Sequence, residues 1–212
     1  MNNLVRMIDR SLTFKQILWL IPIVLTLHNI EEALTMPHWV MENLPLIKES
    51  LPVKIDIRFT PAQLLLSLLL ATIVPFIVTA LCVNGEKQSG KLYLLFLLQA
   101  IVLLNVFVPH IAASIRMKQY NPGVITAVCV NLPFSFYVFR RAYREHYLAS
   151  RQFVSLFLLA LVVYAPIAWA LHFAGEWIAK VLWMSDTLSI KSGYIEILSK
   201  INQQGVRHLS SA

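Results

Sequence analysis

The stretch QILWLIPIVLTLHNIEEALTM, residues 16–36, decides the fold. It is apolar and long enough to cross the ~30 Å hydrocarbon core of a membrane as one helix. Yet it carries a histidine at position 28 and adjacent glutamates at positions 31 and 32. An ionised carboxylate near the middle of such a helix costs about 2.5–3.5 kcal/mol on insertion scales. We therefore expect other helices, and not lipid, to surround this polar end.

The whole chain is more apolar than a soluble protein. Of its 212 residues, 58% are hydrophobic and 14% are charged, whereas soluble domains average about 45–50% and 25%. Its mean hydropathy is +0.66. The composition predicts an all-α polytopic membrane helical bundle, one integral membrane domain over residues 1–212. We expect about five spans, at residues 16–36, 61–83, 92–115, 123–139 and 153–173.

Two segments lie outside the predicted spans. Residues 37–60 contain prolines and scattered apolar residues, which favour a re-entrant or surface-lying segment. Residues 185–212 are expected to form an outer tail with a short amphipathic helix, because apolar residues recur there at helical spacing.

The basic residues predict the orientation of the chain. They concentrate near the N-terminus, after the second span and in the arginine-rich segment before the fifth. By the positive-inside rule, the N-terminus is cytoplasmic and the C-terminus lies outside a multi-pass cell-membrane protein. The net charge of +7 is then mostly membrane-flanking charge. Membrane lipids are the expected partners, and nucleic-acid binding is excluded because it needs a clustered basic surface on a folded domain.

The polar residues of the first span share one face of its helix. At 100° per residue, His28, Glu31 and Glu32 fall within an arc of about 100°. The other outward-running spans also carry polar residues late in their length, so all of these side chains are expected in the outer half of the bundle. They are Asn105 and His110 in the third span and His172 and Glu176 in the fifth. Pro109 is expected to kink the third helix beside His110.

Two motifs, HNIEEALTMPHW and NVFVPHIAASIRMKQYNPGVIT, give a family resemblance. The chain resembles the HXXEE family of small, multi-spanning bacterial and archaeal membrane proteins over roughly residues 14–145. The resemblance implies that the family's named residues fall at His28, Glu31, Glu32, Asn105, His110, Tyr120, Pro122, Gly123 and Thr126. The family has no established activity, so the resemblance supports a site and leaves its chemistry open.

The spacing of the first motif suits a divalent metal, with zinc favoured. Zinc enzymes use ligands at i and i+4 on one helix with a glutamate base between them. By that pattern His28 and Glu32 are ligands, Glu31 is the catalytic base, and His110 is the third ligand. Such a set leaves a fourth position for water. We therefore expect a zinc-dependent hydrolase or transferase that acts on a lipid-borne substrate at the outer side of the membrane.

Other interpretations of the same residues stay open. A di-iron centre would need more carboxylates than the spans provide. An ion- or proton-coupled carrier could use the same cluster without a metal. A structural or immunity-type accessory protein could use it only to join helices. Tyr120, Asn131, His172 and Glu176 are supporting candidates, and Asn131 is expected to form hydrogen bonds between helices. The sequence does not specify the substrate or an oligomeric state.

Overall fold

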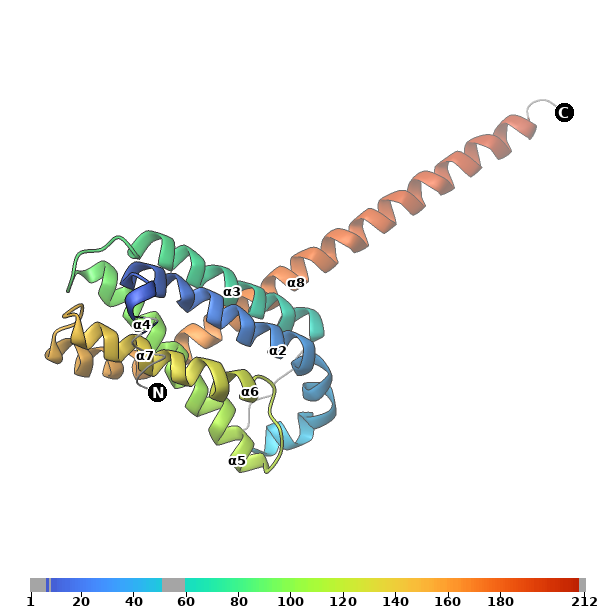
Figure 1. Cartoon of the computed structure of the whole chain (residues 1–212). Helices are drawn as coiled ribbons and strands as arrows, with labels where there is room; N and C mark the ends of the chain where they lie inside the picture. The colour runs from blue at the N-terminus through green and yellow to red at the C-terminus, as the bar shows by residue number, and fades with distance from the viewer. Residues whose placement is uncertain (1–6, 8, 51–59, 210–212) are drawn as a thin grey trace.

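The computed structural model describes the backbone of residues 7, 9–50 and 60–209, and the side chains of these residues through 183, apart from 48 and 50. Among these residues the regular secondary structure is helical, with no strand. The predicted all-α bundle is confirmed, and Figure 1 shows its helices packed side by side, with the end of the last helix projecting from them. The helical elements are α2 (Phe14–Ser50), α3 (Pro61–Cys82), α4 (Gly90–Asn105), η1 (Val106–Ala112), α5 (Ala113–Met117), α6 (Val124–Thr126), η2 (Ala127–Asn131), α7 (Leu132–Arg144) and α8 (Ser150–Leu209).

Side-chain caps explain where two of these helices begin. The Thr60 side chain accepts a hydrogen bond from the backbone N–H of Gln63, and Pro61 occupies the first turn, so α3 begins there. The Ser89 side chain accepts from the backbone N–H of Leu92 and caps α4 in the same way. Both helices therefore begin where local sequence satisfies backbone donors that no helical bond can reach.

Four helices in the described part of the chain are long and apolar enough to cross a membrane. They are Phe14–Ile47, Pro61–Cys82, Gly90–Met117 and Ser150–Trp183. The fourth predicted span, residues 123–139, corresponds to α6, η2 and α7, which follow one another over residues 124–144. This run is divided into short elements by the π-helical segment η2, and it is not among the four.

Two predicted segments differ in the structure. Residues 37–50 continue α2 as a helix although Pro37 and Pro45 lie within it. Each proline removes one helical hydrogen bond, which bends a helix without obliging it to stop. Residues 51–59, the rest of the predicted re-entrant segment, lie outside the described residues. The predicted tail at 185–212 is a continuation of α8 to Leu209, and its amphipathic face falls outside the described side chains.

The bundle has one end that we call the basic end, where α2 begins and where the α3–α4 and α7–α8 turns meet. Lys15 Nζ donates to Asn84 Oδ1 at 3.1 Å, and Lys87 Nζ donates to the Glu145 carbonyl at 2.7 Å. A core of buried aliphatic and aromatic side chains fills this half of the bundle. His28 lies 13 residues after Lys15 on the same helix, about 20 Å further along at 1.5 Å per residue, so the candidate site lies in the other half.

Candidate metal centre

The structure brings together His28, Glu32 and His110, the three residues assigned as metal ligands from the sequence. Glu32 Oε1 lies 3.9 Å from Nε2 of His28 and 3.5 Å from Nε2 of His110. The two imidazole rings meet edge to face, with centroids 4.7 Å apart. Both histidines are 1% exposed and Glu32 is 8% exposed. One ligand atom from each residue lies within 4.8 Å of the other two, so this triad is compact enough to surround one ion.

A π-helical segment places His110 in this triad. Asn105 and His110 are five residues apart, which on an α-helix would separate them by about 140°. In η1 the helix carries one extra residue per turn, and the two side chains face the same point. Pro109 lies inside η1, where the sequence predicted a kink. The Asn121 side-chain amide donates to the Pro109 carbonyl at 2.5 Å, which fixes the loop after α5 against this turn.

Gly123 closes the site from the side of that loop. Its φ is +82°, in the left-handed region that favours glycine. A Cβ atom at this position would lie 2.7 Å from Cε1 of His110 and 2.8 Å from both Cγ of Glu32 and Cε1 of His28. The backbone therefore approaches all three ligand side chains at once, and only glycine leaves room for them.

Hydrogen bonds on the far side of each ring fix the histidine tautomers. The Pro122 carbonyl can only accept, so Nδ1 of His110 donates to it at 2.9 Å. The Thr126 hydroxyl donates to Glu31 Oε2 at 2.5 Å, so it accepts from Nδ1 of His28 at 2.9 Å. In neutral rings both Nε2 atoms are then unprotonated. This is the arrangement of metal-binding histidines, whose second nitrogen is held by a protein acceptor.

The Glu31 carboxylate points away from the triad, towards the start of α6. It accepts hydrogen bonds from Tyr120 Oη at 2.8 Å and from the backbone N–H of Thr126 at 2.8 Å, besides the Thr126 hydroxyl. Burial, together with the nearby Glu31 carboxylate, raises the pKa of the Tyr120 phenol, which therefore keeps its proton as a donor. In this arrangement Glu31 orients Thr126, and through it His28. Its predicted role as catalytic base stays a prediction.

Asn105 and Tyr164 complete the polar surroundings of the triad. The Asn105 side-chain amide donates to Nε2 of His110 at 2.9 Å and lies 3.4 Å from Nε2 of His28. The Tyr164 hydroxyl donates to Asn105 Oδ1 at 2.9 Å and so sets the orientation of that amide. Sequence analysis did not single out Tyr164. The available signal was a hydroxyl-bearing side chain in the middle of an apolar span.

Three other candidates lie elsewhere. Nε2 of His172 lies 3.0 Å from the side-chain amide of Gln63, on α3. Glu176 pairs with Lys180 on its own helix at 2.5 Å. Asn131 is fully buried, and its side-chain atoms have no hydrogen-bond partner among the described residues. Depth in the bundle was therefore a poor guide to which side chains meet.

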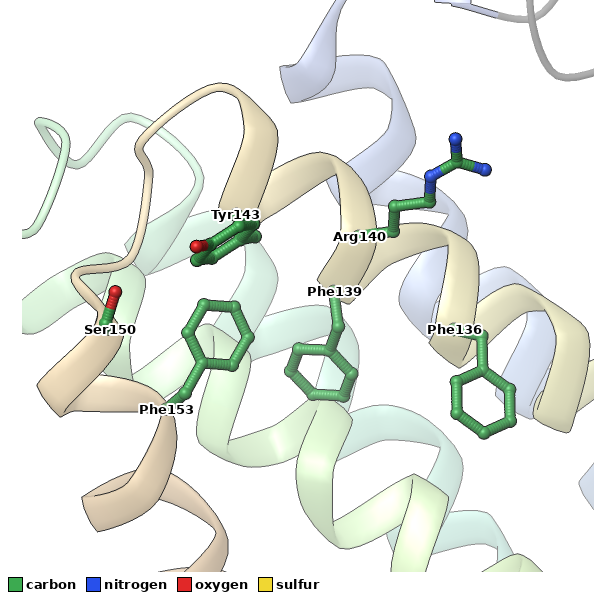
Figure 2. Close-up of a pocket in the computed structure, with 6 residues that line it drawn as sticks. All are labelled: Phe136, Phe139, Arg140, Tyr143, Ser150 and Phe153. Carbon is green, nitrogen blue, oxygen red and sulfur yellow. The ribbon is translucent and has the colours of Figure 1, made fainter.

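Two hollows accompany these helices. A cavity of about 270 Å³ reaches from Glu32 and Asn105 between α2, α3, α4 and α8. The other is an open groove at the basic end, between α7 and the start of α8 (Figure 2). Figure 2 shows Arg140 directed away from the phenylalanine rings of this groove. The groove is lined by Phe136, Phe139, Arg140, Tyr143, Ser150 and Phe153, without histidine or carboxylate.

Comparison with known proteins shows that the chain matches a protein family. A family described as "Protein of unknown function with HXXEE motif" matches residues 19–138, more than half of the chain. The chain belongs to the HXXEE family. The match to this family contains the triad, Gly123 and Thr126, while Tyr164 lies beyond it. An uncharacterized protein, YrkK from Bacillus subtilis (strain 168), is 28% identical over 144 residues, which cover 65% of this chain and 85% of that protein. No solved structure matches the chain.

Proposed function

We propose that this HXXEE protein is a membrane-embedded, zinc-dependent hydrolase or transferase that acts on a lipid-borne substrate. One observation carries the proposal: Glu32 belongs to the triad of possible metal ligands and also lines the 270 Å³ cavity. An ion held by the triad would therefore face a space that a substrate can enter. Buried metal ligands with no adjacent space would suit a purely structural metal site better.

The donor set fits zinc. Two imidazole nitrogens and one carboxylate oxygen are the ligands of a common class of catalytic zinc site, which keeps a fourth position open. Both rings have their Nδ1 atoms held by acceptors, so both Nε2 lone pairs are free of protons in the neutral state. A zinc ion held there would supply a water molecule acidified to a pKa of about 7 as a nucleophile. The triad contains one carboxylate, fewer than a di-iron centre uses.

The surrounding side chains have defined tasks in this proposal. Asn105 donates to the open side of the histidines in the structure. Use of the His110 Nε2 lone pair by an ion would release this hydrogen bond. Tyr164 and Asn105 both line the cavity, so they are placed to hydrogen-bond the carbonyl group of a substrate. Glu31 and Thr126 hold His28 in its tautomer.

A proton- or ion-coupled carrier is the second candidate, favoured by one observation. The Asn105 amide already satisfies Nε2 of His110 at 2.9 Å, so the site is hydrogen-bonded without any ion. A proton shared between Glu32 and His110, 3.5 Å apart, could then be taken up and released. A carrier of this kind would function without a metal.

We place the site on the outer side of the membrane. At the basic end, the first turn of α2 and the α7–α8 turn each contact the α3–α4 turn through a lysine side chain. These segments contain lysines or arginines, which supports an inside location for that end. The triad lies in the opposite half. The N-terminus is then cytoplasmic and the C-terminus outside, in a multi-pass protein of the cell membrane.

Metal content and hydrolysis together test the proposal. Protein purified in chelator-free detergent is expected to hold about one zinc per chain, measured by elemental mass spectrometry. Glu32→Gln and His28→Ala are expected to lose it. His172→Ala, which changes a histidine outside the triad, is the matched control and is expected to keep it. Zinc-loaded protein should release free fatty acid from membrane lipids in nanodiscs, and Glu32→Gln should not.

The outcomes separate the candidates. Absence of metal from correctly folded wild-type protein would exclude the zinc enzyme. Proton or ion flux in liposomes that is insensitive to chelators would support the carrier. Bound zinc without hydrolysis in any lipid mixture would leave the metal site standing and exclude the hydrolase.

A further inference from the structure

The cavity beside the triad is lined mostly by apolar side chains. Aliphatic side chains from α2, α3, α4 and α8 line it, and the aromatic ring of Tyr164 stands at one side. Its polar lining residues are Asn29, Glu32, Asn105 and Tyr164. The side-chain amide of Asn29 donates to Thr72 at 2.8 Å. The polar groups available to a ligand are thus concentrated at the end next to the triad.

Two residues of the cavity lining are also exposed on the surface of apolar helices. Ile167 and Val74, which line the cavity, are 40% and 42% exposed at the surface of the bundle. They belong to α8 and α3, both of which are apolar enough to cross a membrane. In a membrane these exposed faces would contact lipid chains rather than water. A molecule dissolved in the membrane would then reach this side of the cavity without passing through water.

We propose that the cavity binds one hydrocarbon tail of a single-chain lipid, with an uncharged carbonyl or hydroxyl group held next to Glu32, Asn105 and Tyr164. A volume of about 270 Å³ admits about nine methylene-sized groups if each takes up the ~30 Å³ of a water molecule. That is one tail and not two, so a diacyl lipid would have to leave one chain outside. Apart from Glu32, a proposed metal ligand, the lining residues offer no charge to pair with a charged head group.

The polar end must provide the selectivity. Lipid tails are as apolar as the cavity walls, so moving a tail from the membrane into the cavity gains little by itself. Hydrogen bonds at Asn105 and Tyr164 are what distinguish a ligand from bulk lipid. The proposal rests on the proposed function for what happens to the carbonyl group. Binding of the tail does not require the metal.

The test uses a ligand that cannot be hydrolysed. Purified protein, with and without prior removal of metal, is equilibrated with 1-O-octylglycerol, and bound molecules are counted by native mass spectrometry. One molecule per chain is expected in both preparations. Ala168→Phe, which adds a ring to the cavity wall, is expected to weaken binding at least about tenfold. Ala170→Phe is the matched control, an exposed alanine on the same helix that does not line the cavity, and it should bind normally.

A second lining variant, Ala71→Phe on α3, repeats the test from the opposite wall if Ala168→Phe does not fold. Metal content is measured on every sample. Loss of the ligand at unchanged metal content supports the cavity as the tail site, even if no hydrolysis is found. Equal binding in both lining variants and the control, or equal loss in all three, would overturn it.

Discussion

Gly123 and His110 are in such close contact that a Cβ atom on the glycine would lie 2.7 Å from Cε1 of the imidazole. Both residues are buried, so the ring cannot swing into solvent. The Gly123 backbone therefore packs directly against the triad and limits the space around its side chains. Its left-handed backbone, at φ +82°, gives a second reason why no other residue fits.

Gly123→Ala is accordingly expected to disrupt the centre. The added methyl must displace one of the three ligand side chains, at a cost of at least about 2 kcal/mol of unfolding free energy together with the backbone strain. Zinc affinity should fall at least about tenfold, because displacing a ligand removes part of its coordination. Thermal unfolding and competitive zinc titration measure the two effects. Gly90→Ala is the control, because a Cβ there meets nothing within 4 Å. A normal zinc site in Gly123→Ala would contradict this view of the packing.

Thr126→Val tests whether the hydroxyl between Glu31 and His28 orients the ring. Valine keeps the shape but leaves Nδ1 of His28 without its acceptor, which costs about 1–3 kcal/mol of unfolding free energy. Loss of such an outer partner typically lowers metal affinity about 10–100-fold. Thr126→Ser keeps the hydroxyl and should restore both values. Wild-type zinc affinity in the valine variant would show that the ring needs no support from Thr126.

Asn131→Leu is expected to be tolerated. The Asn131 side chain is buried without a hydrogen-bond partner among the described residues, so a leucine, which has the same number and branching of side-chain heavy atoms, loses no bond. The free energy of unfolding should stay within about 0.5 kcal/mol of the wild-type value or rise. Gln99→Leu is the comparison, because its amide donates to Ser135 at 2.7 Å, and it should cost about 1 kcal/mol. A larger loss in Asn131→Leu than in Gln99→Leu, in chemical or thermal unfolding, would indicate that Asn131 has a ligand of its own.

Asp9 is expected to make stability depend on acidity at the basic end. It accepts hydrogen bonds from Tyr137 at 2.8 Å and from Arg144 at 2.9 Å. Burial pushes the pKa of Asp9 up, but these bonds and the charges of Arg141 and Arg144 outweigh it, so the pKa lies below its ordinary 3.8. A lowered pKa means that the stabilisation is complete above pH 3.8 and is lost as the pH falls through the lowered value.

Asp9→Asn removes that dependence. At neutral pH it should cost about 1 kcal/mol of unfolding free energy, which corresponds to a fall of about 2–4 °C in Tm for a chain of this size. As the pH falls through the lowered pKa of Asp9, the variant and the wild type should converge. Glu42→Gln is the control, since Glu42 forms only an exposed pair with His38. Parallel Tm curves for Asp9→Asn and wild type down to the lowest pH would rule out this role.

The sequence predicted which residues meet at the candidate site better than it predicted how they meet there. His28 and Glu32 share a face because a straight helix imposes that spacing. Asn105 and His110 do not share a face on an α-helix, and only Pro109 hinted at the π-helical turn that brings them together. Glu31 was indistinguishable from Glu32 by spacing. The loop after α5 draws it towards Tyr120 and Thr126, a long-range contact with no local pattern.

The sequence did not predict which side chains on different helices would contact one another. His172 lies at a similar predicted depth to His110, but α8 turns that side chain towards Gln63 of α3. Tyr164, two turns earlier on the same helix, reaches Asn105 instead. Helix periodicity fixes which side chains are neighbours along one helix, whereas the rotation of a helix about its axis depends on how all its partners pack.

The π-helical segment η1 has a consequence for comparing relatives. A π-turn holds one residue more than an α-turn, so deleting any one residue of Val106–Ala112 would turn everything beyond it by about 100°. A chain shortened in this way could keep every letter of His-x-x-Glu-Glu and still have no second imidazole opposite it. An alignment gap between the asparagine and the histidine would therefore mark homologues that have lost the centre, more reliably than any change in the motif that names them.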